Sequence, residues 1–416
     1  MDYDVIVIGG GASGMMAAGR AAERGKRVLI LEKNAQLGAK LSITGGGRCN
    51  ITNGERDEQK LLEHYGSAKP FLHSAFAQFG VEATYRFFES RGLPLVEQAH
   101  KRVFPTTEKA GDVVRVLEEY LQQGGVTVRC GASVDRITLL DGRITGVVVG
   151  NQRYTAQAYI LATGGSSHPE TGSTGDGFSW LAMLGHTVQE STPTIVPLAV
   201  ADAWVKKLAG QTLRAVRISI LLDGKRALVL KGDLLCTHFG FSGPLILNAA
   251  GAVADLLHEG TVTAQVDIYP PEDIGALDAR IVTIFDTHKN KTLKNVWNAI
   301  APLGSGQALI PLLSNIQEDI KIHSITKEQR RQIVDLLKGL PVTIQGLMGR
   351  DRAVIADGGV ALNEIDTRTM RSKNYENLFI TGDLLHISRP SGGYSLQLCW
   401  TTGFVAGSNA GEKIDK

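Results

Sequence analysis

The sequence predicts an α/β fold in which a Rossmann-like domain, built from both ends of the chain, carries an inserted domain. One observation is the apolar run of residues 4–8, which leads into Gly9, Gly11 and Gly14. Another is that the pattern of short buried strands stops near residue 190 and resumes after residue 353. Unbroken runs of β-branched residues are typical of strands that are covered on both faces of a parallel sheet.

The three glycines have the GxGxxG spacing of a phosphate-binding turn between a strand and a helix. Gly9 permits the tight turn, Gly11 lets a pyrophosphate approach the backbone, and Gly14 lets the helix pack closely on the strand. Ala12 and Ser13 begin that helix, whose N–H groups and positive dipole end would face the phosphates. We therefore expect a dinucleotide here rather than a purely structural turn.

A second strand, residues 27–31, ends at Glu32, which lies 18 residues after Gly14. A carboxylate at this position can accept hydrogen bonds from both hydroxyls of a ribose. The same charge would repel a 2′-phosphate, so we do not expect NADP at this first site.

The following elements alternate between loops and helices. Residues 44–50 are too rich in glycine for regular structure, whereas residues 57–92 favour helix. Residues 101–105 favour an extended segment. Residues 108–123 predict an amphipathic helix, because their apolar residues recur on one face.

A group of short strands comes next, at 126–130, 133–140 and 144–149. Asp141-Gly142 is a typical hairpin turn between the last two. A buried strand over 159–162 then runs into the small residues Thr163 and Gly164. Such a turn lets a sheet approach the same ligand a second time.

The remaining pattern predicts the inserted domain and the return to the first one. Residues 191–271 are rich in strands and residues 272–352 are mainly helical, so we expect an insertion over 191–352. The Rossmann-like domain would then comprise residues 1–190 and 353–416. Its last parts are a buried strand that ends before Gly382 and Asp383, and a helix that starts after Gly392-Gly393.

Composition describes an ordinary globular protein of 416 residues with 43% hydrophobic residues and a net charge of +2. The scattered basic residues form no stripe, so we expect no nucleic-acid partner. No apolar run reaches the ~18 residues needed to span a membrane, and the chain begins with a structural strand rather than a signal peptide, so we expect a cytoplasmic protein. The widely spaced Cys49, Cys130, Cys236 and Cys399 predict neither a metal site nor a disulfide framework.

Two features near the C-terminus extend the ligand site. Asp383 suits the ribityl hydroxyls or the pyrophosphate region of FAD, although an ordinary Asx turn would look the same. Gly392 and Gly393 would expose two N–H groups at a helix start, which is an anion site. In a flavoenzyme this site would stabilise the charge that develops at flavin N1 and O2 on reduction. A simple glycine-rich helix start is the alternative.

Several side chains are candidates for the chemistry itself. Arg48 and Tyr394 are our candidates for polarising or orienting groups beside the flavin, and His238 or His386 for a proton carrier, although a single histidine is more often structural. Cys49 suits a small apolar filler better than a nucleophile.

A second nucleotide fingerprint is missing from the sequence. Gly304-Ser305-Gly306 has two glycines at the right spacing, but Leu309 stands in the third position and no buried strand precedes it. If NAD(P)H serves as reductant, it therefore binds transiently, without a Rossmann domain of its own.

Five motifs in order resemble a family of bacterial FAD-dependent oxidoreductases. They are Gly45–Asn53, Arg102–Pro105, Thr171–Gly177, Thr237–Gly240 and Gly392–Tyr394. Members are often described as NAD(P)/FAD-dependent oxidoreductases or flavoproteins, and they include aminoacetone oxidases and flavin reductases of bile-acid dehydroxylation. The resemblance covers essentially the whole chain.

The resemblance implies an FAD domain of the two-dinucleotide-binding type and an inserted domain, β-barrel-like and helical, that covers the flavin. It implies that the backbone of Val134, on the strand after the helix of residues 108–123, meets the adenine. Together with the residue patterns, it predicts these cofactor contacts: Gly9, Gly11, Ala12, Ser13, Gly14, Glu32, Lys33, Lys40, Arg48, Cys49, Asn50, Thr163, Gly164, Gly382, Asp383, Gly392 and Gly393.

The chain departs from the family over residues 385–391, where the family often has an acidic stretch containing glycine. The change removes negative charge and adds Arg389, which could bind a carboxylate or phosphate. We therefore expect an anionic or neutral substrate and do not transfer the specificity for amines.

The expected activity is hydride transfer between a small organic substrate and flavin N5. The substrate would be an unsaturated carbonyl compound reduced at C=C, or an amine oxidised with oxygen as acceptor. A flavin- and folate-dependent RNA-modifying enzyme and a non-catalytic flavin-binding protein are the alternatives. The sequence does not specify the oligomeric state.

Overall fold

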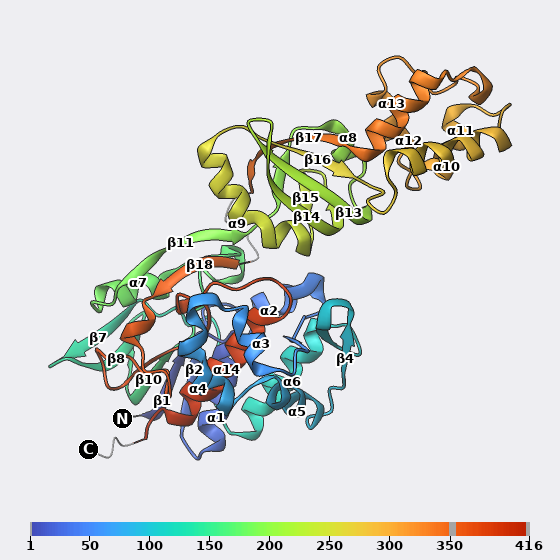
Figure 1. Ribbon diagram of the computed structural model, residues 1–416. Coiled ribbons are helices and arrows are strands. Elements are labelled where there is room, and N and C mark those ends of the chain that lie inside the picture. Colours follow the sequence, from blue (N-terminus) through green and yellow to red (C-terminus); the bar gives the residue numbers. More distant parts are fainter. Residues whose placement is uncertain (1, 349–354, 413–416) are drawn as a thin grey trace. The chain divides into compact units, whose positions relative to one another are not determined.

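The computed structural model describes residues 2–348 and 355–412. The chain divides into two compact units, one of Met1–Pro193 with Val354–Lys416 and one of Thr194–Ala353. β11 (Val188–Ile195) and β18 (Ile355–Val360), which pair with each other, lie at the two points where the chain passes between the units (Figure 1).

A five-stranded sheet forms the centre of the first unit, in the order β19-β10-β1-β2-β6. Every pairing is parallel. The strands are β1 (Tyr3–Ile8), β2 (Val28–Leu31), β6 (Thr127–Arg129), β10 (Ala156–Leu161) and β19 (Leu378–Ile380). The prediction of a parallel Rossmann-like sheet is confirmed, and the strand order reverses its direction beside β1, where ligands bind in such sheets.

The helices of the first unit pack on this sheet, on one another or on neighbouring strands. They are α1 (Ala12–Glu23), α2 (Ala39–Ile43), α3 (Glu58–Glu63), α4 (Lys69–Gln78), α5 (Val81–Glu89), α6 (Ala110–Gln123), α7 (Asp176–Met183) and α14 (Tyr394–Asn409). The amphipathic helix predicted over 108–123 is α6, which buries Val113, Val116 and Leu117. Apolar periodicity was therefore a sufficient signal for this element.

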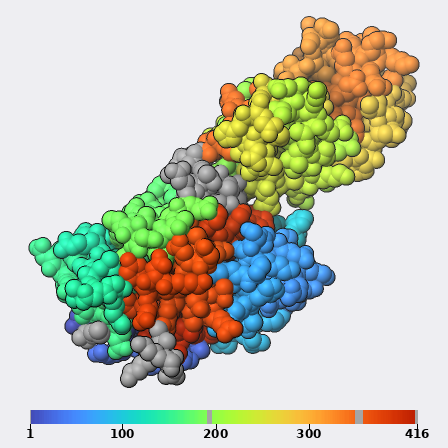
Figure 2. All heavy atoms as spheres, turned by 60° about the vertical axis from the view of Figure 1, so that its left-hand side comes forward, coloured from blue at the N-terminus to red at the C-terminus, as the bar shows by residue number. Residues whose placement is uncertain are grey.

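Two helices from opposite ends of the sequence, α1 and α14, pack backbone to backbone. A Cβ on Gly403 would lie 2.4 Å from the carbonyl oxygen of Ser13, and one on Gly407 would lie 2.3 Å from that of Ala17. From the first contact to the second, the residue number rises by four in both helices, so the two helices run parallel. In the space-filling view, the red C-terminal part of the chain accordingly lies against blue N-terminal segments (Figure 2).

The contacts also fix how far the two helices are displaced along their axes. Gly403 is level with Ser13, the second residue of α1, but it is the tenth residue of α14. The start of α14 therefore extends beyond the start of α1 by about eight residues, or roughly 12 Å at ~1.5 Å per residue. Both N-termini point in the same direction.

Two small antiparallel sheets complete the first unit. They consist of β3 (Thr52–Asn53), β5 (Arg102–Pro105) and β4 (Leu95–Gln98), and of β7 (Arg136–Leu140), β8 (Arg143–Val149) and β9 (Gln152–Tyr154). Asp141 and Gly142 both have positive φ, so the predicted hairpin turn is confirmed.

The second unit contains a closed antiparallel barrel in the order β12-β15-β14-β13-β16-β17. Its strands are β12 (Leu198–Val200), β13 (Thr212–Leu222), β14 (Lys225–Cys236), β15 (Gly240–Ser242), β16 (Val262–Asp267) and β17 (Leu340–Leu347). Alternate residues of β13, such as Val216, Ile218 and Ile220, are buried in its core.

The helices of the second unit are α8 (Ala203–Lys207), α9 (Pro244–Glu259), α10 (Ile274–Thr287), α11 (Leu293–Ile300), α12 (Gly306–Leu309) and α13 (Lys327–Lys338). No helix within residues 2–348 and 355–412 is long and apolar enough to cross a membrane.

Two elements correct the predicted division of the insertion. β17 lies in the part predicted to be helical, yet it pairs with β16 and β12 to close the barrel. α9 lies in the part predicted to be strand-rich. Its apolar run suits a buried helix as well as a strand, and Pro244 at its first position favours a helix start.

We predict that Gly403→Ala destabilises the first unit by about 1–3 kcal/mol, because the added methyl group would clash with the Ser13 carbonyl oxygen. The matched control is Gly111→Ala in α6, where a Cβ meets none of the described atoms within 4 Å. Chemical denaturation followed by far-UV circular dichroism measures the difference. Equal midpoints for the two variants would contradict the packing described above.

Candidate functional site

The predicted ligand residues gather where the parallel strands of the first unit end. Gly9 follows β1, Glu32 follows β2, Thr163 follows β10 and Gly382 follows β19. Because all these strands are parallel, their carboxyl ends share one edge of the sheet. A Cβ on Gly9 would lie 2.4 Å from the carbonyl oxygen of Ala162, which shows how closely the ends of β1 and β10 approach.

The start of α1 forms an open anion cradle. Gly11 is the N-cap residue, and no side chain among the described residues caps the helix. A Cβ on Gly11 would meet no described atom within 4 Å, whereas one on Gly14 would lie 2.0 Å from the Gly9 carbonyl oxygen. The start of α1 thus has free space at Gly11 and no side-chain cap, as a phosphate site requires.

Glu32 is fixed in place by the backbone. One carboxylate oxygen accepts the N–H of Gly10 at 2.6 Å, and the other accepts the N–H of Asn34 at 2.8 Å. A carboxylate offers about four lone-pair sites, so both oxygens can still accept a ribose hydroxyl.

Val134 does not lie on a strand, contrary to the prediction. β7 starts only at Arg136, and Val134 belongs to the loop between β6 and β7. That loop is nevertheless close to the predicted ribose site, because the N–H of Ala132 donates to the carbonyl oxygen of Glu32 at 2.8 Å. The apolar pattern of residues 133–140 predicted a strand, but the hydrogen bond to the end of β2 holds the start of this segment in a loop.

The two predicted lysines already have protein partners. The ammonium of Lys33 donates to the Thr174 hydroxyl at 2.6 Å and pairs with Asp176 at 2.8 Å, so it holds the loop before α7. The Lys40 ammonium donates to the hydroxyl of Ser167 at 2.7 Å, a partner that no motif in the sequence indicated.

Gly382 brings the C-terminal segment to the start of α1. A Cβ on Gly382 would lie 2.9 Å from the hydroxyl oxygen of Ser13. Its N–H donates to the hydroxyl of Thr402 at 3.0 Å, which ties the segment to α14. Gly382 and Asp383 therefore stand next to the anion cradle of α1.

Arg389 does not have a free guanidinium group, contrary to the expectation that it receives an anionic substrate. Its side chain is only 2% exposed and forms an ion pair with Asp383. It also donates to the Ser395 hydroxyl at 3.0 Å and to the carbonyl oxygen of Ile387 at 2.6 Å. Burial alone would raise the pKa of Asp383, but the charges of Arg389 and Lys40 outweigh it and keep that pKa below its usual value.

The start of α14 forms a second anion cradle. Gly393, the N-cap residue, has φ +102°, and a Cβ there would lie 2.2 Å from the carbonyl carbon of Thr52. Only glycine fits both constraints. No described side chain caps this helix, so its first N–H groups are available to a ligand.

A buried polar network holds the first turn of α14. The amide of Gln397 accepts hydrogen bonds from Thr52 at 2.6 Å and Thr84 at 2.9 Å, and it donates to Thr401 at 3.0 Å. No motif in the sequence indicated these residues. The available signal was the pair of polar side chains, four residues apart, inside an otherwise buried helix.

The Gly45–Asn50 loop places its three predicted residues differently. Arg48 lies over the Phe104 ring, 4.5 Å from its centroid, and pairs with Glu108 at 3.5 Å. Since 41% of its side chain is exposed, it can still reach a ligand. Asn50 accepts the N–H of Val103 at 3.2 Å. Cys49 is fully buried, and burial raises the pKa of its thiol to about 12. It is therefore neither a nucleophile nor a surface for the cofactor, which corrects the predicted contact.

Tyr394, predicted as a polarising or orienting group, and the two predicted proton carriers, His386 and His238, lie in different places. Tyr394, at the start of α14, is almost buried, and burial with the nearby charge of Glu55 raises its pKa to about 12. His386 follows Asp383 by three residues, and its Nδ1 is buried without a hydrogen-bond partner in the part of the chain that the structure describes. His238 is exposed on the loop between β14 and β15 of the second unit.

The residues present fit FAD. Two uncapped helix starts face in one direction, the Glu32 carboxylate is oriented as a ribose partner would have to be, and the buried hydroxyl of Thr163 has no partner among the described residues. By contrast, no group of His, Cys, Asp and Glu within residues 2–348 and 355–412 could hold a metal ion.

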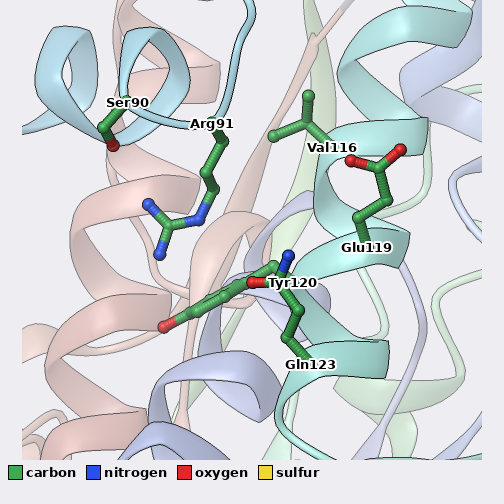
Figure 3. Close-up of a pocket in the computed structure, with 6 residues that line it drawn as sticks. All are labelled: Ser90, Arg91, Val116, Glu119, Tyr120 and Gln123. Atoms are coloured by element: carbon green, nitrogen blue, oxygen red, sulfur yellow. The ribbon is translucent and has the colours of Figure 1, made fainter.

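A pocket of about 340 Å³ lies elsewhere in the first unit, between the end of α5 and α6 (Figure 3). It is lined by Ser90, Arg91, Val116, Glu119, Tyr120 and Gln123. Tyr120 packs against Gly19, in the second half of α1. This pocket is therefore separate from the cradle at the start of α1.

Comparison with known proteins identifies relatives over the full chain. A family described as "HI0933-like protein Rossmann domain" matches residues 3–409. A 3-dehydro-bile acid delta(4,6)-reductase of Clostridium scindens is 31% identical, over 98% of each chain. A ribosomal RNA dihydrouridine synthase of Escherichia coli is 26% identical, over 97% of this chain and 96% of that protein.

Solved structures share the fold. A 3-ketosteroid-delta4-(5alpha)-dehydrogenase from Rhodococcus jostii has a TM-score of 0.51 and 16% identity, and the match covers 99% of this chain and 97% of that one. A 3-ketosteroid delta1-dehydrogenase from Sterolibacterium denitrificans has a TM-score of 0.54 and 13% identity, over 98% and 99%. At these identities the likeness shows the architecture alone.

We predict that Gly11→Ala weakens FAD binding at least about tenfold, because its methyl group would stand where the pyrophosphate must approach the backbone. The unfolding of its FAD-free form should match wild type, since the methyl group meets open space. Gly9→Ala is the contrasting variant, because its Cβ would clash with Ala162 and should lower the melting temperature. Fluorescence titration with FAD and thermal melts of the FAD-free proteins measure both effects. Unchanged FAD affinity in Gly11→Ala would contradict the site.

Proposed function

Since the chain belongs to the family of HI0933-like proteins with a Rossmann domain, and is an FAD-dependent oxidoreductase, we propose that it transfers a hydride between flavin N5 and a small organic substrate. The observation that carries this proposal is the pair of parallel helices, α1 and α14, with uncapped starts roughly 12 Å apart along their axes. One elongated dinucleotide can contact both starts at once.

Different residues would contact different parts of the cofactor. The cradle at Gly11 would hold the pyrophosphate, Glu32 the adenine-side ribose, and the cradle at Gly393 the flavin ring. When bound, FAD supplies the hydride donor or acceptor. The N–H groups at the start of α14 would stabilise the negative charge that develops along the pyrimidine edge of the ring.

Tyr394 is our candidate for the proton donor. With a pKa of about 12, its phenol keeps its proton throughout the neutral range and can hold it beside the ring at the start of α14. Arg48 would orient the substrate from the neighbouring glycine-rich loop. His386 and His238 remain alternative proton carriers.

For the substrate we propose an unsaturated carbonyl compound that is reduced at C=C. The bile-acid reductase relative supports this class, since it is 31% identical over almost the entire length of both chains. The ion pair between Arg389 and Asp383 removes the argument for an anionic substrate. NAD(P)H would act as a transient reductant, because the sequence contains no second nucleotide fingerprint.

A second candidate is the reduction of uridine in ribosomal RNA. It is favoured by the two relatives that are ribosomal RNA dihydrouridine synthases, each 26% identical over almost the whole chain. The net charge of +2 and the scattered basic residues favour the small-molecule substrate instead.

Anaerobic mixing of the FAD-loaded protein with NADH or NADPH distinguishes these activities. We predict rapid bleaching of the flavin absorbance, and its return when a conjugated steroid ketone is added. Bleaching by aminoacetone with reoxidation by oxygen would contradict the proposal and indicate an oxidase. Dihydrouridine formed in total ribosomal RNA, with no turnover of conjugated ketones, would support the second candidate instead.

We predict that Tyr394→Phe slows reoxidation of the reduced protein by a conjugated ketone at least about a hundredfold, because the proton donor is lost. FAD affinity should be unchanged, since the variant keeps the aromatic side chain and the backbone N–H groups at the start of α14. Tyr375→Phe is the control. Tyr375 lies before the amino end of β19, whereas the candidate site lies at the carboxyl ends of the strands. Stopped-flow spectroscopy gives the rates, and equal rates in both variants would contradict the role of Tyr394.

A further inference from the structure

Lys40, Asp383 and Arg389 form a compact charged cluster at the start of α1. One Asp383 oxygen pairs with the Arg389 guanidinium, and the other lies 3.5 Å from the Lys40 ammonium. Gly382, the neighbour of Asp383, packs against the hydroxyl of Ser13 in the first turn of α1. The cluster therefore borders the cradle proposed for the cofactor pyrophosphate.

The members of the cluster differ in their access to solvent. The side chains of Lys40 and Asp383 are 23% and 19% exposed, whereas that of Arg389 is 2% exposed. Arg389 is held behind Asp383 by its hydrogen bonds to Ser395 and to the Ile387 carbonyl. A ligand at this edge can thus touch Lys40 and Asp383, but it cannot touch Arg389.

The cluster carries a net charge of +1. Two cations face one carboxylate, and the neighbouring Cys399 stays neutral because burial raises the pKa of its thiol to about 12. Without Arg389, the charges of Lys40 and Asp383 would cancel, and a nearly buried carboxylate would stand beside the negatively charged pyrophosphate. Like charges at such a site oppose binding strongly because little water screens them.

We propose that Arg389 is a positioning residue that neutralises Asp383 and so leaves the Lys40 ammonium as a net positive contact for the pyrophosphate of the dinucleotide. This inference rests on the proposed FAD site and on no particular substrate. The proposal explains why residues 385–391 differ from the family. The difference supplies the positive charge of Arg389, which acts through Asp383 and does not bind the substrate.

A set of charge variants tests this role: Arg389→Met, Asp383→Asn, the double variant, and Arg389→Lys as the conservative control. Fluorescence titration gives the dissociation constant of FAD, and calorimetry gives that of ADP, which has the pyrophosphate but no flavin. Melting temperatures of the FAD-free proteins report folding separately.

We expect Arg389→Met to weaken both ligands at least about tenfold, and Arg389→Lys to restore most of the loss. Asp383→Asn should bind at least as tightly as wild type. The double variant should return to within about threefold of wild type, because no carboxylate is left to neutralise. An affinity of the double variant as low as that of Arg389→Met would overturn the proposal and assign Arg389 a direct or purely structural role.

Two further measurements test the proposal even if the Arg389→Met variant does not fold. In the Asp383→Asn background, removal of Arg389 should cost less than about threefold in ADP affinity, and a larger loss would contradict the proposal. Weaker FAD binding in Asp383→Asn, with ADP binding unchanged, would show instead that Asp383 binds the ribityl hydroxyls. Because ADP binding requires no turnover, a failure to reduce conjugated ketones would contradict the proposed function without affecting this result.

Discussion

The structure of the candidate site depends on the close parallel packing of α1 and α14. Gly403 and Gly407 let the backbone of α14 rest on the carbonyl oxygens of Ser13 and Ala17, and no larger side chain fits there without displacing backbone. This packing brings residues from the two ends of the sequence to one edge of the sheet. It also fixes the distance between two uncapped helix starts, which allows one elongated ligand to contact both of them.

Charge at this edge is balanced by groups of the protein itself, namely backbone N–H groups and two cationic side chains. Glu32 is oriented by two backbone N–H groups, and Asp383 is paired with two cations. Glu32 keeps lone pairs for a ligand, and Lys40 and Asp383 stay partly exposed while Arg389 is buried behind Asp383. A polar ligand can therefore bind without having to reorganise the protein, which is the usual advantage of a preorganised site.

The parts of the site that follow from local sequence could be predicted, and the parts that depend on distant contacts could not. The strand–glycine–helix pattern placed Gly9, Gly11, Gly14 and Glu32, because parallel strands must end at the same edge. The pairing of Arg389 with Asp383, by contrast, could not be predicted, because no local sequence pattern indicates which charged side chains face each other. The enclosure of Cys49 and the loop position of Val134 likewise depend on packing against other segments.

Hydrogen exchange of backbone amides, compared between the ADP and FAD complexes, tests most directly whether the two helix starts serve one ligand. ADP contains the adenine, ribose and pyrophosphate, so it should slow exchange at Gly11–Gly14 and leave Gly392–Ser395 unchanged. FAD should slow exchange at both helix starts. Exchange at Gly392–Ser395 that is equally fast in the FAD and ADP complexes would contradict the account, because the flavin would then lie away from α14.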